Sequence, residues 1–187
     1  MYSQKISIYG SILENGIESK CNWYFEGDKA CMELIFRNQE NSITTTRLIM
    51  NSSNQQLKIV TINNESRNCY STIADSIKDT KSKTINFVST HIKKEFDIFG
   101  ICTKIQARDV TNEYLIYVFE NENINLSRFQ TFIKNDKIFE FISSTKSNQF
   151  PVQAITTLSN GELQRSYLAE TYSLEVPSYI FSTESCN

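Results

Sequence analysis

Hydrophobic and polar residues alternate most clearly around the Gly27-Asp28 pair. A two-residue turn at this point predicts an antiparallel hairpin over Lys20–Arg37. Three pairs are then expected opposite each other: Phe25 with Ala30, Trp23 with Met32, and Cys21 with Leu34. One face is apolar and is expected on the core: Cys21, Trp23, Phe25, Ala30, Met32, Leu34 and Phe36. The other face is mostly polar and is expected to contact water: Asn22, Tyr24, Glu26, Lys29, Cys31, Glu33 and Arg37.

Short segments that favour strands recur along the whole chain. Their connectors are rich in Asn and Ser, and the Asn160-Gly161 pair is typical of a second hairpin turn. Many short strands with turn-rich connectors predict a mainly β (α+β) fold with an antiparallel sheet or barrel. Further strands are predicted at Ile6–Ile12, Ile43–Met50, Gln56–Ile62, Ile85–Thr90, Ile101–Ala107, Glu113–Glu120, Val152–Leu158 and Leu163–Leu174.

Two segments show helical spacing instead. Tyr70, Ile73, Ala74 and Ile77 recur every three or four residues after Asn68, which predicts a helix there. The segment Asn125–Lys146 contains two apolar stripes, separated by the Asn135-Asp136 pair. We expect this segment to form two short helices that cover the sheet, because a sheet that is apolar on both faces needs such a cover.

The strand predicted at Tyr114–Phe119 is apolar on both faces. Such a strand is either central in the sheet and covered on both sides, or it lines an apolar pocket beside the Asn125–Lys146 helices. A pocket of this kind would accept an acyl chain. The sequence leaves both alternatives open.

Size and charge exclude several classes of protein. The chain has 187 residues, 40% of them hydrophobic, which fits one domain with a packed core. Its 19 basic and 21 acidic residues leave no positive surplus to hold a phosphate backbone, so nucleic acid is not an expected partner. No segment approaches the roughly 20 apolar residues needed to cross a bilayer. The start of the sequence shows no export signal, so the protein is either cytosolic or exported with its signal removed.

The five cysteines and the single histidine do not predict a metal site. No pair of cysteines has C-x-x-C spacing, and His91 is the only imidazole. His91 stands beside two lysines and is interpreted as a solvated residue at a strand end. Most of the cysteines are expected to pack as small apolar side chains. The hairpin register places Cys21 and Cys31 on opposite faces, which disfavours a disulfide between them.

Motifs for catalysis are missing from the sequence. There is no nucleophile elbow, Walker loop, dinucleotide-binding glycine motif or H-E-x-x-H motif. Two acidic pairs, Glu120 with Glu122 and Asp109 with Glu113, have the chemistry that glycoside hydrolysis uses. They fall in predicted turns and are interpreted as solvated. The protein is therefore not expected to be an enzyme, although a hydrolase with carboxylates on the concave face is an alternative.

Three motifs in the second half resemble a domain of unknown function from Gram-negative envelope proteins, which is grouped with the LolA/LolB-like lipoprotein-carrier fold. The segment Lys93–Lys104 resembles the strand entry K-x-I-x-G-Y-x-C-x-K of that family, although Gly100 and Cys102 stand two positions apart rather than three. Phe150-Pro151-Val152 resembles its F-P-(l/v) entry, and Ala169–Phe181 resembles its closing element.

This resemblance implies an exported, periplasmic or outer-membrane-associated protein, with residues 1–187 in a single LolA/LolB-like domain. It implies a strongly curved antiparallel sheet that forms an unclosed barrel, with short helices on its concave face. The expected ligand is a lipid or lipoprotein acyl chain, without a cofactor, and peripheral membrane association is possible in this setting. The expected ligand-binding residues are Trp23, Phe25, Met32, Leu34, Phe36, Ile116, Val118, Phe129 and Ile133. The alternative is a structural or interaction module of the envelope, with a filled core and no ligand.

Overall fold

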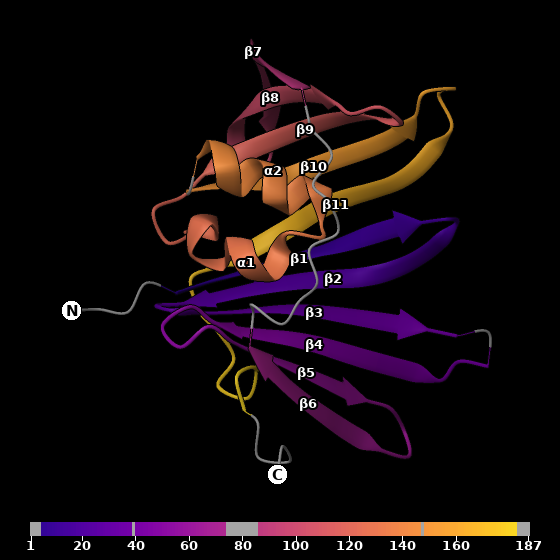
Figure 1. The fold of residues 1–187 in the computed structure, drawn as a ribbon, viewed down its shortest axis with the longest axis vertical. Coiled ribbons are helices and arrows are strands. Elements are labelled where there is room, and N and C mark those ends of the chain that lie inside the picture. The colour runs from indigo at the N-terminus through magenta and orange to yellow at the C-terminus, as the bar shows by residue number, and fades with distance from the viewer. Residues whose placement is uncertain (1–4, 39, 74–85, 147, 183–187) are drawn as a thin grey trace.

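The computed structural model describes residues 5–38, 40–73, 86–146 and 148–182, and its main element is one antiparallel sheet (Figure 1). Its eleven strands are β1 (Lys5–Glu14), β2 (Ile17–Glu26), β3 (Lys29–Arg37), β4 (Ile43–Asn51), β5 (Gln56–Ile62), β6 (Arg67–Ile73), β7 (Asn86–Phe96), β8 (Gly100–Arg108), β9 (Asn112–Glu120), β10 (Gln149–Leu158) and β11 (Leu163–Ser173). The predicted β-rich fold class is confirmed.

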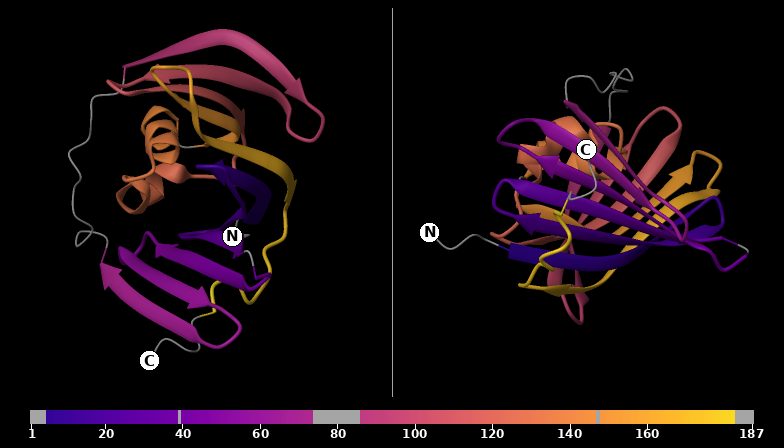
Figure 2. Two further views of the ribbon diagram at one scale, coloured as in Figure 1. Left: turned by 90° about the vertical axis from the view of Figure 1, so that its right-hand side faces the viewer. Right: turned by 90° about the horizontal axis from the view of Figure 1, so that it is seen from below.

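The sheet consists of two meanders that meet at the first and last strands. The strand order is β6-β5-β4-β3-β2-β1-β11-β10-β9-β8-β7, so β6 and β7 are the two edges in the described part of the chain. The sheet curls around the helices without closing into a barrel (Figure 2). At the β1–β11 seam the register shifts next to Gly10. A Cβ atom on Gly10 would lie 2.4 Å from the Leu168 carbonyl oxygen, so this close approach of two backbones requires glycine.

The predicted β2–β3 hairpin is confirmed residue by residue. Phe25 pairs with Ala30, Trp23 with Met32, and Cys21 with Leu34. Cys21 and Cys31 are free thiols, so the predicted absence of a disulfide between them is confirmed.

The helix predicted from Tyr70 onward is wrong for its first turn. Residues up to Ile73 belong to strand β6, in which Tyr70 pairs with Ile59 of β5. Tyr70 and Ile73 are both mostly exposed, because β6 is an edge strand that packs only weakly on the core. Two solvated edge residues three positions apart imitate helical spacing. The rest of the predicted helix, with Ala74 and Ile77, lies outside the described residues.

The two helices predicted in the third quarter of the chain are confirmed. A 3₁₀ turn, η2 (Leu126–Phe129), leads into α1 (Gln130–Ile133), and α2 (Lys137–Thr145) follows after a break at the predicted Asn135-Asp136 pair. They lie inside the curve of the sheet (Figure 2). The Phe139 ring packs 4.5 Å from the Trp23 ring and 5.6 Å from the Phe150 ring, between centroids.

Part of the outer face of the hairpin is covered, contrary to the prediction that it contacts water, whereas Lys29 and Arg37 on this face are exposed as predicted. Asn22, Tyr24, Cys31 and Glu33 are all buried there. The chain after β11 runs back across this face and contributes fully buried Ile180 to a second apolar cluster, together with Tyr24, Cys31, Ile49 and Val60. The cover comes from residues about 150 positions away in the sequence, which a local alternation pattern cannot reveal.

A buried ion pair lies under this cover. The Arg47 Nε atom is 2.8 Å from Glu33 Oε1, and both side chains are almost fully buried. Glu33 Oε2 accepts hydrogen bonds from the Tyr24 hydroxyl at 2.9 Å and from the Asn22 amide at 3.3 Å. The Arg47 guanidinium also lies 5.2 Å from the ring centre of Tyr179. The pair is therefore satisfied from several sides, as a buried charge requires.

Candidate ligand-binding pocket

A continuous apolar row crosses the concave face from the core to the β6 edge. Cross-strand pairing joins Trp23 to Met32, Met32 to Leu48, Leu48 to Ile59, and Ile59 to Tyr70. Directly paired residues in antiparallel strands share a face. Exposure to solvent increases along the row: Trp23 is fully buried, the middle three residues are half-buried, and Tyr70 is 62% exposed. The row thus leads from the interior to solvent.

A pocket of about 250 Å³ lies over the inner part of this row, at Trp23, Met32 and Leu48. The sheet provides the floor through β2 to β5, and the end of α1 with the following loop provides the opposite wall. It is lined mainly by apolar side chains: Trp23, Met32, Leu48, Met50, Leu57, Phe132 and Ile133, with Asn135 and Asp136 as the polar members.

The nine residues expected to bind a ligand lie in three different settings. Trp23, Met32 and Ile133 line the pocket. Leu34 is half-buried against the core, while Phe36 is 36% exposed near the end of β3. The remaining four are buried in the core: Phe25, Ile116, Val118 and Phe129. The structure therefore brings only part of the expected set to a pocket, and their role in binding stays a prediction.

The strand predicted with two apolar faces is central in the sheet, but only one of its faces is fully buried, because Leu115 and Tyr117 on the other face are half-buried. Ile116 and Val118 of β9 are almost fully buried in the main core, and β9 has a paired strand on each side. The pocket lies instead over β2 to β5. Four of its apolar lining residues were not expected: Leu48, Met50, Leu57 and Phe132. Two of them could have been predicted from the alternation of apolar residues in the strands Ile43–Met50 and Gln56–Ile62. If the register of the hairpin is extended by two strands, Leu48 and Leu57 lie on the concave face.

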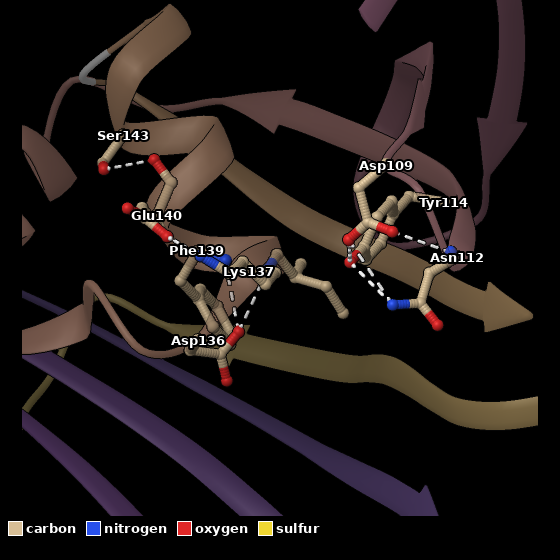
Figure 3. A network of polar contacts seen from close by, with 9 residues as sticks. Asp109, Asn112, Tyr114, Asp136, Lys137, Phe139, Glu140 and Ser143 are labelled. Carbon is tan, nitrogen blue, oxygen red and sulfur yellow. Dashed lines mark hydrogen bonds and ion pairs between the residues drawn. The ribbon is translucent and has the colours of Figure 1, made fainter. Parts of the chain in front are cut away.

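Asp136 forms a polar end to the pocket. Its Oδ1 atom accepts hydrogen bonds from the backbone N–H groups of Ile138 and Phe139 at 3.2 and 3.3 Å and so caps α2 (Figure 3). Its Oδ2 atom lies 2.9 Å from Nη2 of Arg165 on β11. Burial lowers the pKa of Arg165, but the neighbouring Asp136 outweighs this effect and raises it overall. Arg165 therefore stays charged beside the pocket.

One member of each acidic pair considered for hydrolysis forms structural hydrogen bonds, whereas Glu113 and Glu122 are exposed as predicted. The Glu120 carboxylate accepts hydrogen bonds from Lys146 and Gln149, which lower its pKa. Asp109 is buried, and its side chain accepts hydrogen bonds from the backbone N–H groups of Thr111 and Asn112 and from the Tyr114 hydroxyl. Figure 3 shows Asp109 beside Asn112 and Tyr114. The interpretation of Asp109 as solvated is therefore wrong, because its carboxylate organises the β8–β9 turn.

The Asp109 turn is expected to lose stability in acid. Burial raises the pKa of Asp109, but its hydrogen bonds outweigh burial and hold the pKa at about 2. A depressed pKa means that the stabilisation is complete above the ordinary carboxyl pKa and disappears as the pH falls through about 2. Asp109→Asn should therefore lower the free energy of unfolding by about 2 kcal/mol at pH 6 and have little effect at pH 2. Urea unfolding at both pH values measures this. An equal loss at both would contradict a role for the ionised carboxylate.

The cysteines provide no metal site in the described part of the chain. Three of them are buried free thiols, Cys21, Cys31 and Cys102, and burial raises the pKa of each. Cys69 is disulfide-bonded, whereas Cys186 lies outside the described residues. His91 belongs to β7, but its side chain is also outside the described part. Within the described residues no group of three His, Cys, Asp or Glu residues could hold a metal ion, and no helix is long and apolar enough to span a membrane.

Comparison with known proteins finds distant structural similarity. No protein-family model and no curated protein matches the chain. The crystal structure of MucB is similar at 7% identity with a TM-score of 0.39, and the match covers 94% of this chain and 55% of MucB. The chain thus spans about half the length of MucB. A DUF1329 family protein from Desulfovibrio piger is similar at 6% identity with a TM-score of 0.25, over 99% of this chain and 92% of that one. Similarity this low does not establish a family or a function, although the open curved sheet that the LolA/LolB-like resemblance implied is confirmed.

Proposed function

We propose that the protein is a non-enzymatic binder of a hydrocarbon chain, such as an acyl chain of a lipid or lipoprotein, and that the chain end enters the pocket over β2 to β5. The observation that carries the proposal is the apolar row from buried Trp23 to exposed Tyr70, with the pocket above it. The row is buried at the Trp23 end and exposed to solvent at the Tyr70 end, which suits a long ligand that enters with one end first. An exported, periplasmic or outer-membrane-associated setting is part of this proposal.

The size of the pocket favours a chain over a bulkier ligand. Pockets for drug-sized molecules usually measure about 300–1,000 Å³, whereas this one measures about 250 Å³. It therefore has room for one end of a flexible chain, while the rest of the chain would continue along Leu48 and Ile59 towards the β6 edge. Burial of a methylene group stabilises a complex by about 0.8 kcal/mol, so several methylene groups suffice for measurable binding.

Trp23 provides a direct test, because it is the only tryptophan and lines the pocket. A bromine-labelled alkane, 1-bromododecane, is expected to quench Trp23 fluorescence with saturation. Leu48→Glu should weaken this binding at least about tenfold, since it places a charge on the apolar floor. Leu168→Glu is the matched control, because Leu168 is 44% exposed on β11 and does not line the pocket. Absence of saturable quenching in the unmodified protein would refute the proposal.

A second candidate function is a structural or interaction module without a ligand. Its support is the filled state of the rest of the concavity, where Phe25 packs 6.1 Å from Phe129 between ring centroids and the helices cover Ile116 and Val118. Native mass spectrometry of the purified protein separates the two. Retained acyl species favour the binder, and a single species at the bare mass, combined with no quenching by the bromoalkane, favours the module.

A further inference from the structure

The chain after β11 crosses the outer face of the first meander, formed by β1 to β6. We call residues 174–182 the C-terminal strap, and Figure 2 shows it along the outside of the sheet. The Ser7 hydroxyl on β1 donates a hydrogen bond to the Glu175 carbonyl oxygen at 2.5 Å. At the other end, the Arg67 guanidinium on β6 donates a hydrogen bond to the Ser182 carbonyl oxygen at 3.4 Å. The strap therefore spans the outer face from the seam to β6.

Side-chain packing, rather than strand pairing, holds the strap on the sheet. Its described residues lie in turns and irregular structure, and no described strand pairs with it. Ile180 is fully buried, and Val176 and Phe181 are partly buried against the same cluster, which contains Tyr24 and Cys31. A segment without a ladder of backbone hydrogen bonds opens more easily than a strand. A covalent link near its end would therefore strongly favour the closed position.

Cys69 lies on β6, on the face of the sheet that the strap covers. It pairs with Val60 of β5, and Val60 pairs with Arg47 of β4. Directly paired residues share a face, and Val60 belongs to the cluster that contains Ile180. Cys69 packs against the same cluster. It is also two positions after Arg67, so both side chains are on the face that the end of the strap contacts.

The number of cysteines identifies the partner of Cys69. Cys69 is disulfide-bonded, whereas three other cysteines, all buried, are free thiols. The sequence contains five cysteines, which leaves Cys186, four positions after Ser182. A chain of four residues spans at most about 14 Å, whereas two positions along a strand are about 7 Å apart. The chain is therefore long enough to carry Cys186 from the end of the strap to Cys69.

We propose that a disulfide between Cys69 and Cys186 holds the C-terminal strap on β6, so that oxidation keeps the outer face closed and reduction lets the strap open. This inference goes beyond the proposed function, because it concerns the outer face and needs no ligand. Disulfides persist in oxidising compartments, such as the periplasm or the cell exterior, and are rare in the cytosol. The bond therefore also supports the exported setting that is part of the proposed function.

The bond forms and breaks by thiol–disulfide exchange. The thiolate of one cysteine attacks the disulfide of a small-molecule oxidant and displaces one of its thiolates, and the second cysteine thiolate then attacks the mixed disulfide and displaces the other. Two protein thiols are thereby oxidised, and the oxidant is reduced to two thiols. A dithiol such as dithiothreitol reverses both steps and becomes a cyclic disulfide. Reduction under native conditions should release the strap without breaking another bond, because the other three cysteines are free.

Mass mapping of tryptic peptides without a reductant tests the bond in the full-length protein. Cleavage after Arg67 and Arg165 places Cys69 in residues 68–78 and Cys186 in residues 166–187. We expect these two peptides to be joined in the oxidised protein and separate after treatment with dithiothreitol. If the Cys69 peptide from the unreduced protein is recovered alone, or joined to any other peptide, the proposal is overturned.

Cys31 reports whether reduction opens the strap, because it is fully buried in the cluster that contains Ile180. Iodoacetamide is added under native conditions after the dithiothreitol has been removed. We expect Cys31 to be alkylated at least about tenfold faster than in the oxidised protein, since opening of the strap exposes its thiol. Cys21 is the internal control, because it is buried in the main core and should keep its rate. An unchanged Cys31 rate would overturn opening by reduction.

Cys69→Ser and Cys186→Ser break the bond without a reductant. Each should accelerate Cys31 alkylation as reduction does, and should lower the melting temperature by about 5–15 °C, as expected for a disulfide that closes a long loop. The double variant should melt with either single variant, because both substitutions remove the same bond. Additive losses would contradict the pairing. Quenching of Trp23 by the bromoalkane reports on the concave face, so the two proposals succeed or fail separately.

Discussion

Replacement of Glu33 by alanine is expected to lower the free energy of unfolding by about 3–5 kcal/mol, because it leaves the buried Arg47 guanidinium without a counter-ion. The Tyr24 hydroxyl and the Asn22 amide would lose their acceptor in the same step. Desolvated groups that lose their partner account for most of such an effect, rather than the attraction between the two charges. Chemical denaturation at pH 7 measures the change.

A surface ion pair in the same sheet provides the matched control for Glu33. The Glu26 carboxylate lies 2.7 Å from the Lys5 ammonium, with side chains 31% and 43% exposed. Water solvates both groups when the pair is broken, so Glu26→Ala should change stability by less than about 1 kcal/mol. Similar losses in the two variants would contradict the view that burial sets the effect.

Replacement of Gly10 by alanine is expected to lower stability by about 3 kcal/mol. The added methyl group would meet the Leu168 carbonyl oxygen at 2.4 Å, and this oxygen belongs to the backbone of β11, so it cannot rotate away. The two strands would have to move apart at the seam that joins both halves of the sheet. Thermal unfolding followed by circular dichroism measures the loss.

Gly16 separates this steric effect from the general effect of removing a glycine. Gly16 has a φ of +79°, but an added Cβ there would meet no atom within 4 Å. Gly16→Ala should therefore lower stability by about 1 kcal/mol through backbone strain alone. A larger loss at Gly16 than at Gly10 would contradict the close approach at the seam.

The local pattern of hydrophobic and polar residues was sufficient to predict structure where two paired segments are close in the sequence. The Gly27-Asp28 turn fixes the register of β2 against β3, and strict alternation on both sides of the turn identifies the core face. The break between the two short helices was also predictable, because Asp136 is a good helix-capping residue and its side chain does cap α2.

Local pattern failed where a segment has few neighbours or a distant one. Among the described residues, strand β6 has a partner on one side only, so Tyr70 and Ile73 are exposed and show no alternation that indicates a strand. Part of the polar face of the hairpin is buried by Ile180 and its neighbours, which are distant from the hairpin in the sequence.

The polar end of the pocket was unpredictable for the same reason. Asp136 and Arg165 lie on separate elements, and no motif encodes their ion pair. The chemistry of this part of the site depends on tertiary structure, whereas the apolar floor follows from strand alternation.

The position of the seam also has a consequence for synthesis on the ribosome. Within each meander, successive strands pair with their neighbours in the chain, so both can form as soon as they emerge. The seam is different, because Ile8 faces Tyr172 and the two are separated by most of the polypeptide. Before translation reaches β11, the nascent first meander therefore has an unpaired outer strand, β1, that could pair with another nascent chain. A folding helper that shields β1 until β11 arrives would raise the yield of correctly assembled protein.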